Sequence, residues 1–235
     1  MSDRWVFTLI LWSVHGAVFF AVCGVYGLLH RLEVAPRFRV VQGKAPPAPL
    51  LRRALHEVLV GQVVLLPVSA YVLFPAWRWM GGELAAPAPS LATIAWQVVA
   101  CIVLQDTLFY WSHRALHTKW LFRAVHRRHH DFRYVRGLAA EYAHPLELAV
   151  NLLSIMAGPI LLAVHPVTLA VWLMIRMAET VEAHSGYAFT AIASRHAYHH
   201  LYAARGCLGS FFGLWDRLMG TDQHWRRWRR EQTHR

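Results

Sequence analysis

The stretch DTLFYWSHRALH, from Asp106 to His117, joins the end of an apolar run to a pair of histidines. Asp106, Tyr110, His113 and His117 recur at helical spacing, so one face of a helix presents them as a stripe. An acid inside an apolar run long enough to cross a bilayer is costly and is functional by default. We expect Asp106 either to orient a metal-binding imidazole or to make a structural hydrogen bond to a neighbouring helix.

The composition around this stretch is that of a membrane protein. Of 235 residues, 56% are hydrophobic and 16% are charged, against about 25% charged in a typical soluble domain. In a membrane protein, a net charge of +11 indicates basic cytoplasmic loops and argues against nucleic acid as the partner. Three cysteines without a CxxC pair imply neither a disulfide framework nor a thiolate zinc site, so any metal must rest on histidine, of which the chain has 16.

Five apolar segments predict an all-α integral membrane bundle of about four to five transmembrane or re-entrant helices. The last two are separated only by His165 and Pro166, which predicts a tight hairpin that does not necessarily cross the membrane fully. The segments run approximately over residues 5–29, 58–77, 91–111, 146–164 and 166–181.

The basic residues predict the orientation of the bundle. Residues 31–57, residues 113–145 and the tail after His184 are rich in Lys and Arg, whereas residues 80–90 carry neither. The positive-inside rule then places these three regions in the cytoplasm, with five crossings and the N-terminus outside. We expect the sequence WRRWRR in the tail to anchor the chain at the membrane surface, although an Arg- and Trp-rich tail can also bind nucleic acid. A single domain is expected, with membrane helices at 1–105, a catalytic histidine-box region at 106–221 and a basic tail at 222–235.

The histidines form an HxxxH box and two HxxHH boxes at the predicted cytoplasmic end of the bundle. Each box places its imidazoles on one face of a short helix, and two more histidines lie in AHPLE and EAHSGY. One such box alone is often a solvated basic face, but the combination favours a cytoplasmic cap that binds two metal ions. The predicted ligands are His113, His117, His126, His129, His130, His144, His184, His196, His199 and His200.

The ligand type narrows the chemistry. Imidazole suits zinc, copper, iron and nickel, and an all-nitrogen two-metal centre at a membrane surface favours oxygen activation by iron. A membrane zinc hydrolase is an alternative, but the chain has no HExxH motif. A metal transporter is another, although it requires ligands along a path through the bilayer instead of at one mouth.

Six stretches carry a resemblance to a known family: DTLFYWSHRALH, HRRHH, AHPLE, EAHSGY, HAYHH and LWDRLMGT. In order and spacing, from Asp106 to Thr221, they resemble the fatty acid hydroxylase superfamily, also called the sterol desaturase family. This resemblance implies a membrane-bound di-iron enzyme that uses O2 and two electrons to hydroxylate or desaturate an unactivated C–H bond of a lipid, such as a sterol, fatty acyl chain or sphingolipid. It also implies the ten ligands above, and zinc is expected as a possible substitute for iron in a structure.

Three carboxylates are expected to hydrogen-bond the outer sides of the ligand imidazoles: Asp106, Glu147 and Asp216. For Glu147, a charge at the membrane interface is an equal alternative. The resemblance further implies that Trp215, Asp216 and Arg217 brace the ligand cap. Because the chain has no HPGG motif, no cytochrome b5 domain is fused to it, and electrons must come from a separate ferredoxin or cytochrome b5-type reductase system. The short, Ala- and Arg-rich chain, which ends without a dilysine signal, predicts a bacterial inner membrane protein with the metal site and C-terminus facing the cytoplasm.

Overall fold

The computed structural model describes residues 1–203 and 206–233, and this part of the chain is helical, without named strands. The predicted all-α fold is confirmed. Its elements, in chain order, are α1 (Asp3–Arg31), η1 (Pro36–Phe38), α2 (Ala48–Val60), η2 (Gly61–Leu65), α3 (Leu66–Trp79), α4 (Leu91–Leu116), α5 (Lys119–Ala124), η3 (His126–Asp131), η4 (Gly137–Glu141), α6 (Pro145–Leu161), α7 (Pro166–Ala183), α8 (Ala191–Leu201), α9 (Leu214–Leu218) and α10 (Gln223–Thr233).

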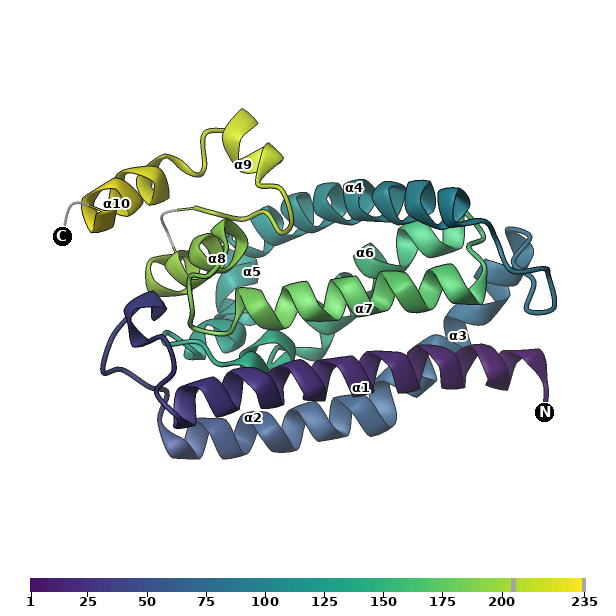
Figure 1. Cartoon of the computed structure of the whole chain (residues 1–235), viewed down its shortest axis with the longest axis horizontal. Coiled ribbons are helices and arrows are strands. Elements are labelled where there is room, and N and C mark those ends of the chain that lie inside the picture. Colours follow the sequence, from purple (N-terminus) through teal and green to yellow (C-terminus); the bar gives the residue numbers. More distant parts are fainter. Residues whose placement is uncertain (204–205, 234–235) are drawn as a thin grey trace.

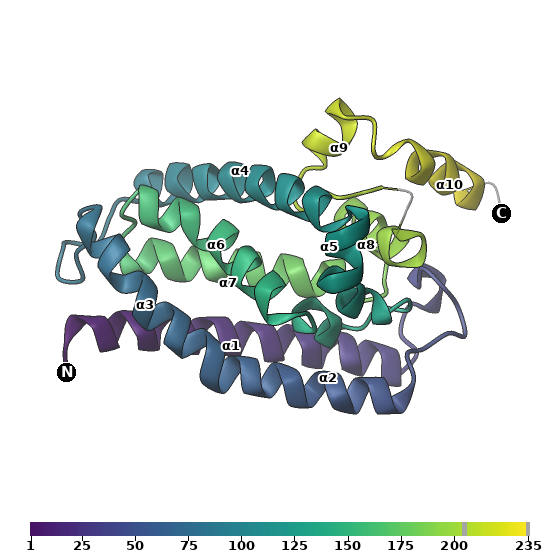
Figure 2. The ribbon, with the colours of Figure 1, turned by 180° about the vertical axis from the view of Figure 1, so that it is seen from behind.

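Among the described residues, 3 helices are long and apolar enough to cross a membrane: α1, the continuous helix α2–η2–α3, and α4. The other two predicted segments form α6, which is apolar but shorter, and α7, which carries three charged residues near its end. Figures 1 and 2 show α6 and α7 lying between α4 on one side and α1 on the other. The bundle therefore has the predicted helices, three of them of membrane-spanning length.

The α6–α7 pair forms the predicted hairpin. Pro145 and Pro166 stand in the first turns of the two helices, where a missing N–H costs nothing. A Cβ atom at Gly158 of α6 would lie 2.8 Å from the sulfur of Cys101 in α4. Gly158 thus allows the two backbones to approach closely, as small residues do between membrane helices.

The outer faces of the long helices expose apolar side chains, whereas the inner faces bury aromatic ones. Val63, Val68 and Val72 are more than half exposed, and such continuous apolar surface suits lipid better than water. Inside, Trp77 and Trp172 are fully buried in a core that joins helices from both sides of the bundle. The structure therefore has the outside and inside expected of a protein in a bilayer.

The second long helix differs from its prediction at two points. It begins at Ala48, so residues 48–57, which were expected to form a basic loop, are helical and bury Ala54. The arginines of this stretch are exposed, on the side away from the buried face. They lower the mean hydropathy of residues 48–57, so hydropathy alone did not indicate a helix there. A π-helical turn at Gly61–Leu65, which was not predicted, interrupts the regular hydrogen bonds, and Trp12 of α1 donates to the carbonyl of Gln62 there at 2.7 Å.

The histidine-bearing elements gather at one end of the bundle. α5, α8 and the short helices between α5 and α6 lie at the end opposite the N-terminus (Figures 1 and 2). The tail folds back there, because Trp225 of α10 is buried and donates to Ser194 of α8 at 3.1 Å. Trp225 is therefore part of the protein core and not a membrane anchor, although Arg226, Arg227 and Arg229 remain exposed. Residues 234 and 235 of the predicted tail lie outside the described residues.

Candidate metal centre

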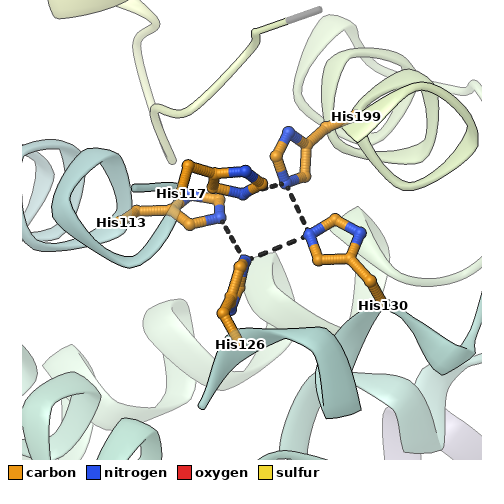
Figure 3. Close-up of side chains that lie close together, drawn as sticks. All are labelled: His113, His117, His126, His130 and His199. Carbon is orange, nitrogen blue, oxygen red and sulfur yellow. Dashed lines mark hydrogen bonds between the residues drawn. The ribbon is translucent and has the colours of Figure 1, made fainter. Parts of the chain in front are cut away.

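Nine of the ten predicted ligands converge in two groups whose nitrogen atoms lie within 4.8 Å of one another in each group. The first, called here the five-histidine group, is shown in Figure 3 and comprises His113, His117, His126, His130 and His199. The second, the four-histidine group, comprises His129, His184, His196 and His200. Clustering at one end of the bundle is what the sequence predicted, whereas the division into these two sets was not.

Each HxxHH box contributes to both groups. In η3, His126 and His130 belong to the five-histidine group, and His129 belongs to the other. In α8, His196 and His200 share one face, as residues i and i+4 do, and His199 turns to the five-histidine group. The two histidine groups are therefore adjacent, because each HxxHH box supplies ligands to both of them.

The outer nitrogens of these rings determine which nitrogen is free to bind. Nδ1 of His113, His199, His129, His184 and His200 lies 2.8–3.2 Å from a backbone carbonyl oxygen. Because a carbonyl only accepts hydrogen bonds, each of these Nδ1 atoms carries the proton in the neutral ring. Each Nε2 is then left with a lone pair that points into the centre.

The Nε2 atoms face one another at distances that suit a shared ion. In the five-histidine group, His113–His126, His126–His130, His130–His199 and His117–His199 are separated by 3.0–3.1 Å between Nε2 atoms (Figure 3). In the four-histidine group the corresponding distances are 2.9–3.3 Å. Ligands about 2.1 Å from one ion lie about 3 Å apart when they are at right angles.

Lone pairs that face one another without a proton between them repel, and a cation between them removes that repulsion. The pair His113 and His126 shows this plainly, since both Nδ1 atoms are engaged outside, with Leu208 and with Glu147. The nine rings therefore fit metal ions, one for each group.

Burial keeps the rings neutral. It lowers the pKa of His129 to about 4 and that of His117 to about 2. The same desolvation holds the pKa values of His184, His196 and His200 well below the ordinary value. At neutral pH these imidazoles are unprotonated, which is the form that binds metal.

The three predicted supporting carboxylates act at different points. Glu147, at the start of α6, lies 2.8 Å from Nδ1 of His126 through Oε1, the arrangement that orients a metal-binding imidazole. Asp216 accepts from the backbone N–H groups of Leu208 and Gly209, both at 2.8 Å. Since the Leu208 carbonyl holds His113, Asp216 supports that ring through the chain.

Asp106 reaches the backbone N–H of Ser210 at 3.2 Å and, among the described residues, no imidazole. Because it lies two helical turns before His113, its short side chain meets the segment that folds along α4 instead of the ring. Asp106 thus bonds neither a ligand imidazole nor a neighbouring helix, the two alternatives considered from the sequence. Asp106 is linked to the metal centre only indirectly, because the segment 208–210 that it bonds also carries the carbonyl that bonds His113.

His144 is the predicted ligand that the structure leaves outside both groups. It precedes Pro145 at the N-terminus of α6, where its Nδ1 accepts from the backbone N–H of Leu146 at 3.2 Å. The arginines of the HRRHH box also have separate places. Arg127 is exposed, and Arg128 pairs with Glu57 of α2.

A cavity of about 210 Å³ adjoins the centre. Histidines of both groups form one wall of this cavity, including His126 and His196, and apolar side chains of η2, α3, α6 and α7 form the others. Its wall also includes Arg176 and Gln62, which sequence reasoning missed. The signal for Arg176 was present, because it is the sole cation in the fifth apolar segment.

Helices of membrane-spanning length with two histidine groups at one end define a histidine-rich membrane metalloprotein. The family model described as fatty acid hydroxylase matches residues 98–221, and the chain belongs to this family. This membership confirms the resemblance and makes the chain an oxidoreductase, as predicted.

The chain is similar over most of its length to known proteins of plants and a fungus. It is 38% identical to the very-long-chain aldehyde decarbonylase GL1-11 of Oryza sativa subsp. indica, with 93% of this chain and 86% of the relative covered. It is 33% identical to the methylsterol monooxygenase 2-1 of Arabidopsis thaliana, covering 91% and 87%. It is also 33% identical to the methylsterol monooxygenase erg25A of Aspergillus fumigatus, covering 91% and 76%. No solved structure matches the chain.

Proposed function

We propose that this protein is a membrane-bound di-iron oxygenase that oxidises an unactivated C–H bond of a lipid, using O2 and electrons from a separate donor. The observation that carries the proposal is the cavity, which lies between apolar helices and meets histidines of both groups at one wall. A lipid that enters between the helices would place a carbon beside the two groups. The names of the relatives, which refer to methylsterols and to very-long-chain aldehydes, support a lipid substrate.

The nine converging histidines are the proposed ligands, and His144 is not included among them. Iron bound by such imidazole sets supplies the oxygen activation that protein side chains cannot provide. The chain orients the imidazoles. Glu147 holds His126, and backbone carbonyls hold five other rings in the tautomer that leaves Nε2 free. The apolar lining of the cavity excludes water from the substrate.

Two alternatives are less well supported by the geometry. A metal transporter requires ligands along the membrane, but both histidine groups lie at one end of the bundle among the described residues. A zinc hydrolase requires a carboxylate that activates water beside the metal. Glu147 is a cavity-lining carboxylate in contact with a ligand ring, but its Oε1 is engaged with the outer nitrogen of His126 and not with a metal-facing nitrogen.

The orientation and the electron donor are also proposed. The end that carries the histidines includes the exposed arginines of α10, which the positive-inside rule assigns to the cytoplasm. A basic surface attracts an acidic ferredoxin or cytochrome by electrostatic steering. The prediction of a bacterial inner membrane receives no support from the relatives, which come from plants and a fungus.

The test is to load the protein with iron without air, measure metal per chain, and follow lipid oxidation after adding O2 and a reductant. Two irons per chain and oxidised lipid that appears only with O2 support the proposal. A zinc-loaded sample is the control and is expected to be inactive. Turnover by the zinc form without O2 would overturn the proposal in favour of a hydrolase.

A further inference from the structure

Arg176 is a buried cation at the wall of the cavity. It belongs to α7, whose middle is apolar, and it is 5% exposed. A guanidinium inside a membrane-embedded bundle is costly unless its donors are satisfied, and such residues usually serve a function. Arg176 is not a metal ligand and makes no contact with either histidine group through a hydrogen bond among the described residues.

The donors of Arg176 are only partly satisfied. Nη1 donates to Oε2 of Glu179, and in the described part of the chain this is its one hydrogen-bonded partner. Nε is buried without any partner. The centroids of the Phe109 and Phe211 rings each lie 6.0 Å from Cζ of Arg176, which is within cation–π range and uses no N–H donor. The guanidinium therefore keeps unused N–H groups, and its residue is part of the cavity wall.

The ion pair of Arg176 and Glu179 is held in place by neighbouring residues. Oε1 of Glu179 accepts from the hydroxyl of Ser210 at 2.9 Å, and the N–H of Ser210 donates to Asp106. Three elements thus fix the position of Glu179 and, through it, that of Arg176. Such preorganisation reduces the entropy lost when a ligand binds.

The same helix sets the distance from Arg176 to the metal centre. His184, which caps the C-terminal end of α7, follows Arg176 by eight residues, which is about 12 Å along the helix axis. Between them, the carbonyl of Thr180 holds Nδ1 of His184 at 2.8 Å. An oxygen atom bound at Arg176 would therefore keep a lipid in a defined register with the four-histidine group.

We propose that Arg176 binds the oxygen atom at the polar end of the substrate, and that this substrate is a neutral oxygen-bearing lipid such as an alcohol or an aldehyde. This inference rests on the proposed function and names its substrate class. Hydroxyl and carbonyl oxygens accept an N–H without adding charge. Glu179 already neutralises Arg176, and Asp106 lies behind Ser210, so a fatty carboxylate would bring an unbalanced negative charge into a medium of low dielectric constant.

The test compares four lipids of equal chain length on the iron-loaded protein in nanodiscs. Hexadecanol, hexadecanal, hexadecanoate and hexadecane are titrated anaerobically, and binding is followed by tryptophan fluorescence. The alcohol and the aldehyde are expected to bind at least about 10-fold more tightly than the carboxylate or the alkane. Equal binding of the carboxylate and the alcohol would overturn the inference.

Variants assign the preference to Arg176. Arg176→Met combined with Glu179→Gln removes both charges, so that no unpaired carboxylate is left, and it is expected to bind the alcohol about 10–100-fold more weakly while binding hexadecane unchanged. Arg78→Met, which alters an exposed arginine outside the cavity, is the control and is expected to keep the preference. An unchanged preference for the alcohol in the double variant would overturn the inference.

Metal content separates this failure from failure of the proposed function. If the double variant keeps two irons per chain and loses the preference, Arg176 is the docking group. If the wild type binds two irons and oxidises lipid but shows no preference for neutral oxygen-bearing lipids, the inference fails and the proposed function stands. If the wild type oxidises no lipid with O2, the proposed function fails.

Discussion

The five-histidine and four-histidine groups differ in what holds their rings. In the four-histidine group all rings are buried, and three of them bond backbone carbonyls, those of Tyr142, Thr180 and Phe132. The five-histidine group includes two partly exposed rings, and Nδ1 of one of them, His130, has no partner among the described residues.

The five-histidine group also depends more on side chains. Glu147 holds His126 directly, and Asp216 holds the segment whose Leu208 carbonyl bonds His113. Substituting a side chain leaves the backbone carbonyl of that residue in place, whereas substituting Glu or Asp removes the carboxylate itself. We therefore expect metal binding at the five-histidine group to be adjustable through its supporting residues, and binding at the four-histidine group to change mainly when a ligand itself is replaced.

The largest effect is expected from His184→Ala, which removes the ring that contacts both His129 and His196 through Nε2. The four-histidine group should lose its ion, so metal per chain should fall from two to one, and lipid oxidation should fall by more than about 100-fold. Elemental analysis and an oxidation assay measure the two quantities. His56→Ala, which changes an exposed histidine, is the matched control and should retain both ions. Two ions in the His184 variant would disprove the assignment.

Glu147→Ala should weaken the five-histidine group alone, because it frees His126 from its partner. Loss of such a supporting carboxylate typically lowers metal affinity by about 10–100-fold. Titration with a chelator should release one ion early and leave the second bound as in the wild type. Glu147→Gln keeps an oxygen acceptor and should restore part of the affinity, whereas Glu83→Ala, at an exposed position, should change nothing. Equal weakening of both ions would contradict the comparison.

Asp216→Asn should have a smaller effect that is mostly on stability. Its two carboxylate oxygens each accept from one backbone N–H, and an amide can accept from only one of them. The expected loss is about 1.5–3 kcal/mol, measured by thermal denaturation of the metal-loaded protein. The chelator titration should show the five-histidine ion slightly weakened through His113. Asp3→Asn, an exposed change, is the control, and a stability equal to the control would refute the role of Asp216.

The smallest effects are expected from the two arginines of HRRHH. Arg128→Ala breaks a partly exposed pair with Glu57 and should cost no more than about 1 kcal/mol in stability. Arg127→Ala changes an exposed side chain and should cost less still. Both variants should keep two metal ions and unchanged chelator titrations. Loss of metal in either variant would show that the arginines support the centre after all.

Much of the fold was predictable because apolar length and helical spacing are local properties. They identified α4, with its stripe from Asp106 to His117, and the α6–α7 hairpin. The start of α2 was missed because Arg52 and Arg53 lower the hydropathy of a stretch whose other face packs inside. The π-helical turn at Gly61–Leu65 was missed because no local pattern distinguishes it from a regular helix.

For the candidate site, most of the ligands were predictable from the sequence, whereas the contacts that support them were not. The spacing of HxxxH and HxxHH predicted the residues of the centre, since eight of the rings brought together come from these three boxes. The expectation that all rings of one box share a face was wrong for the HxxHH boxes, because His129 and His199 each belong to the other group than the remaining rings of their box.

His144 carried no such spacing, and the Pro145 that follows it begins α6, so its ring turns to the Leu146 N–H. The contact of Asp106 with Ser210 joins residues far apart in the chain, which no local pattern reveals.

The sequence by itself determined that this protein is a helical membrane protein with a histidine centre, because composition and periodicity act within single segments. Only the tertiary structure decided how the rings divide between two groups, which nitrogen each presents and what supports it. Those properties depend on carbonyls and carboxylates that loops bring from distant positions. The same holds for Arg176, whose unused donors become visible only when α4, α7 and residues 208–212 are packed together.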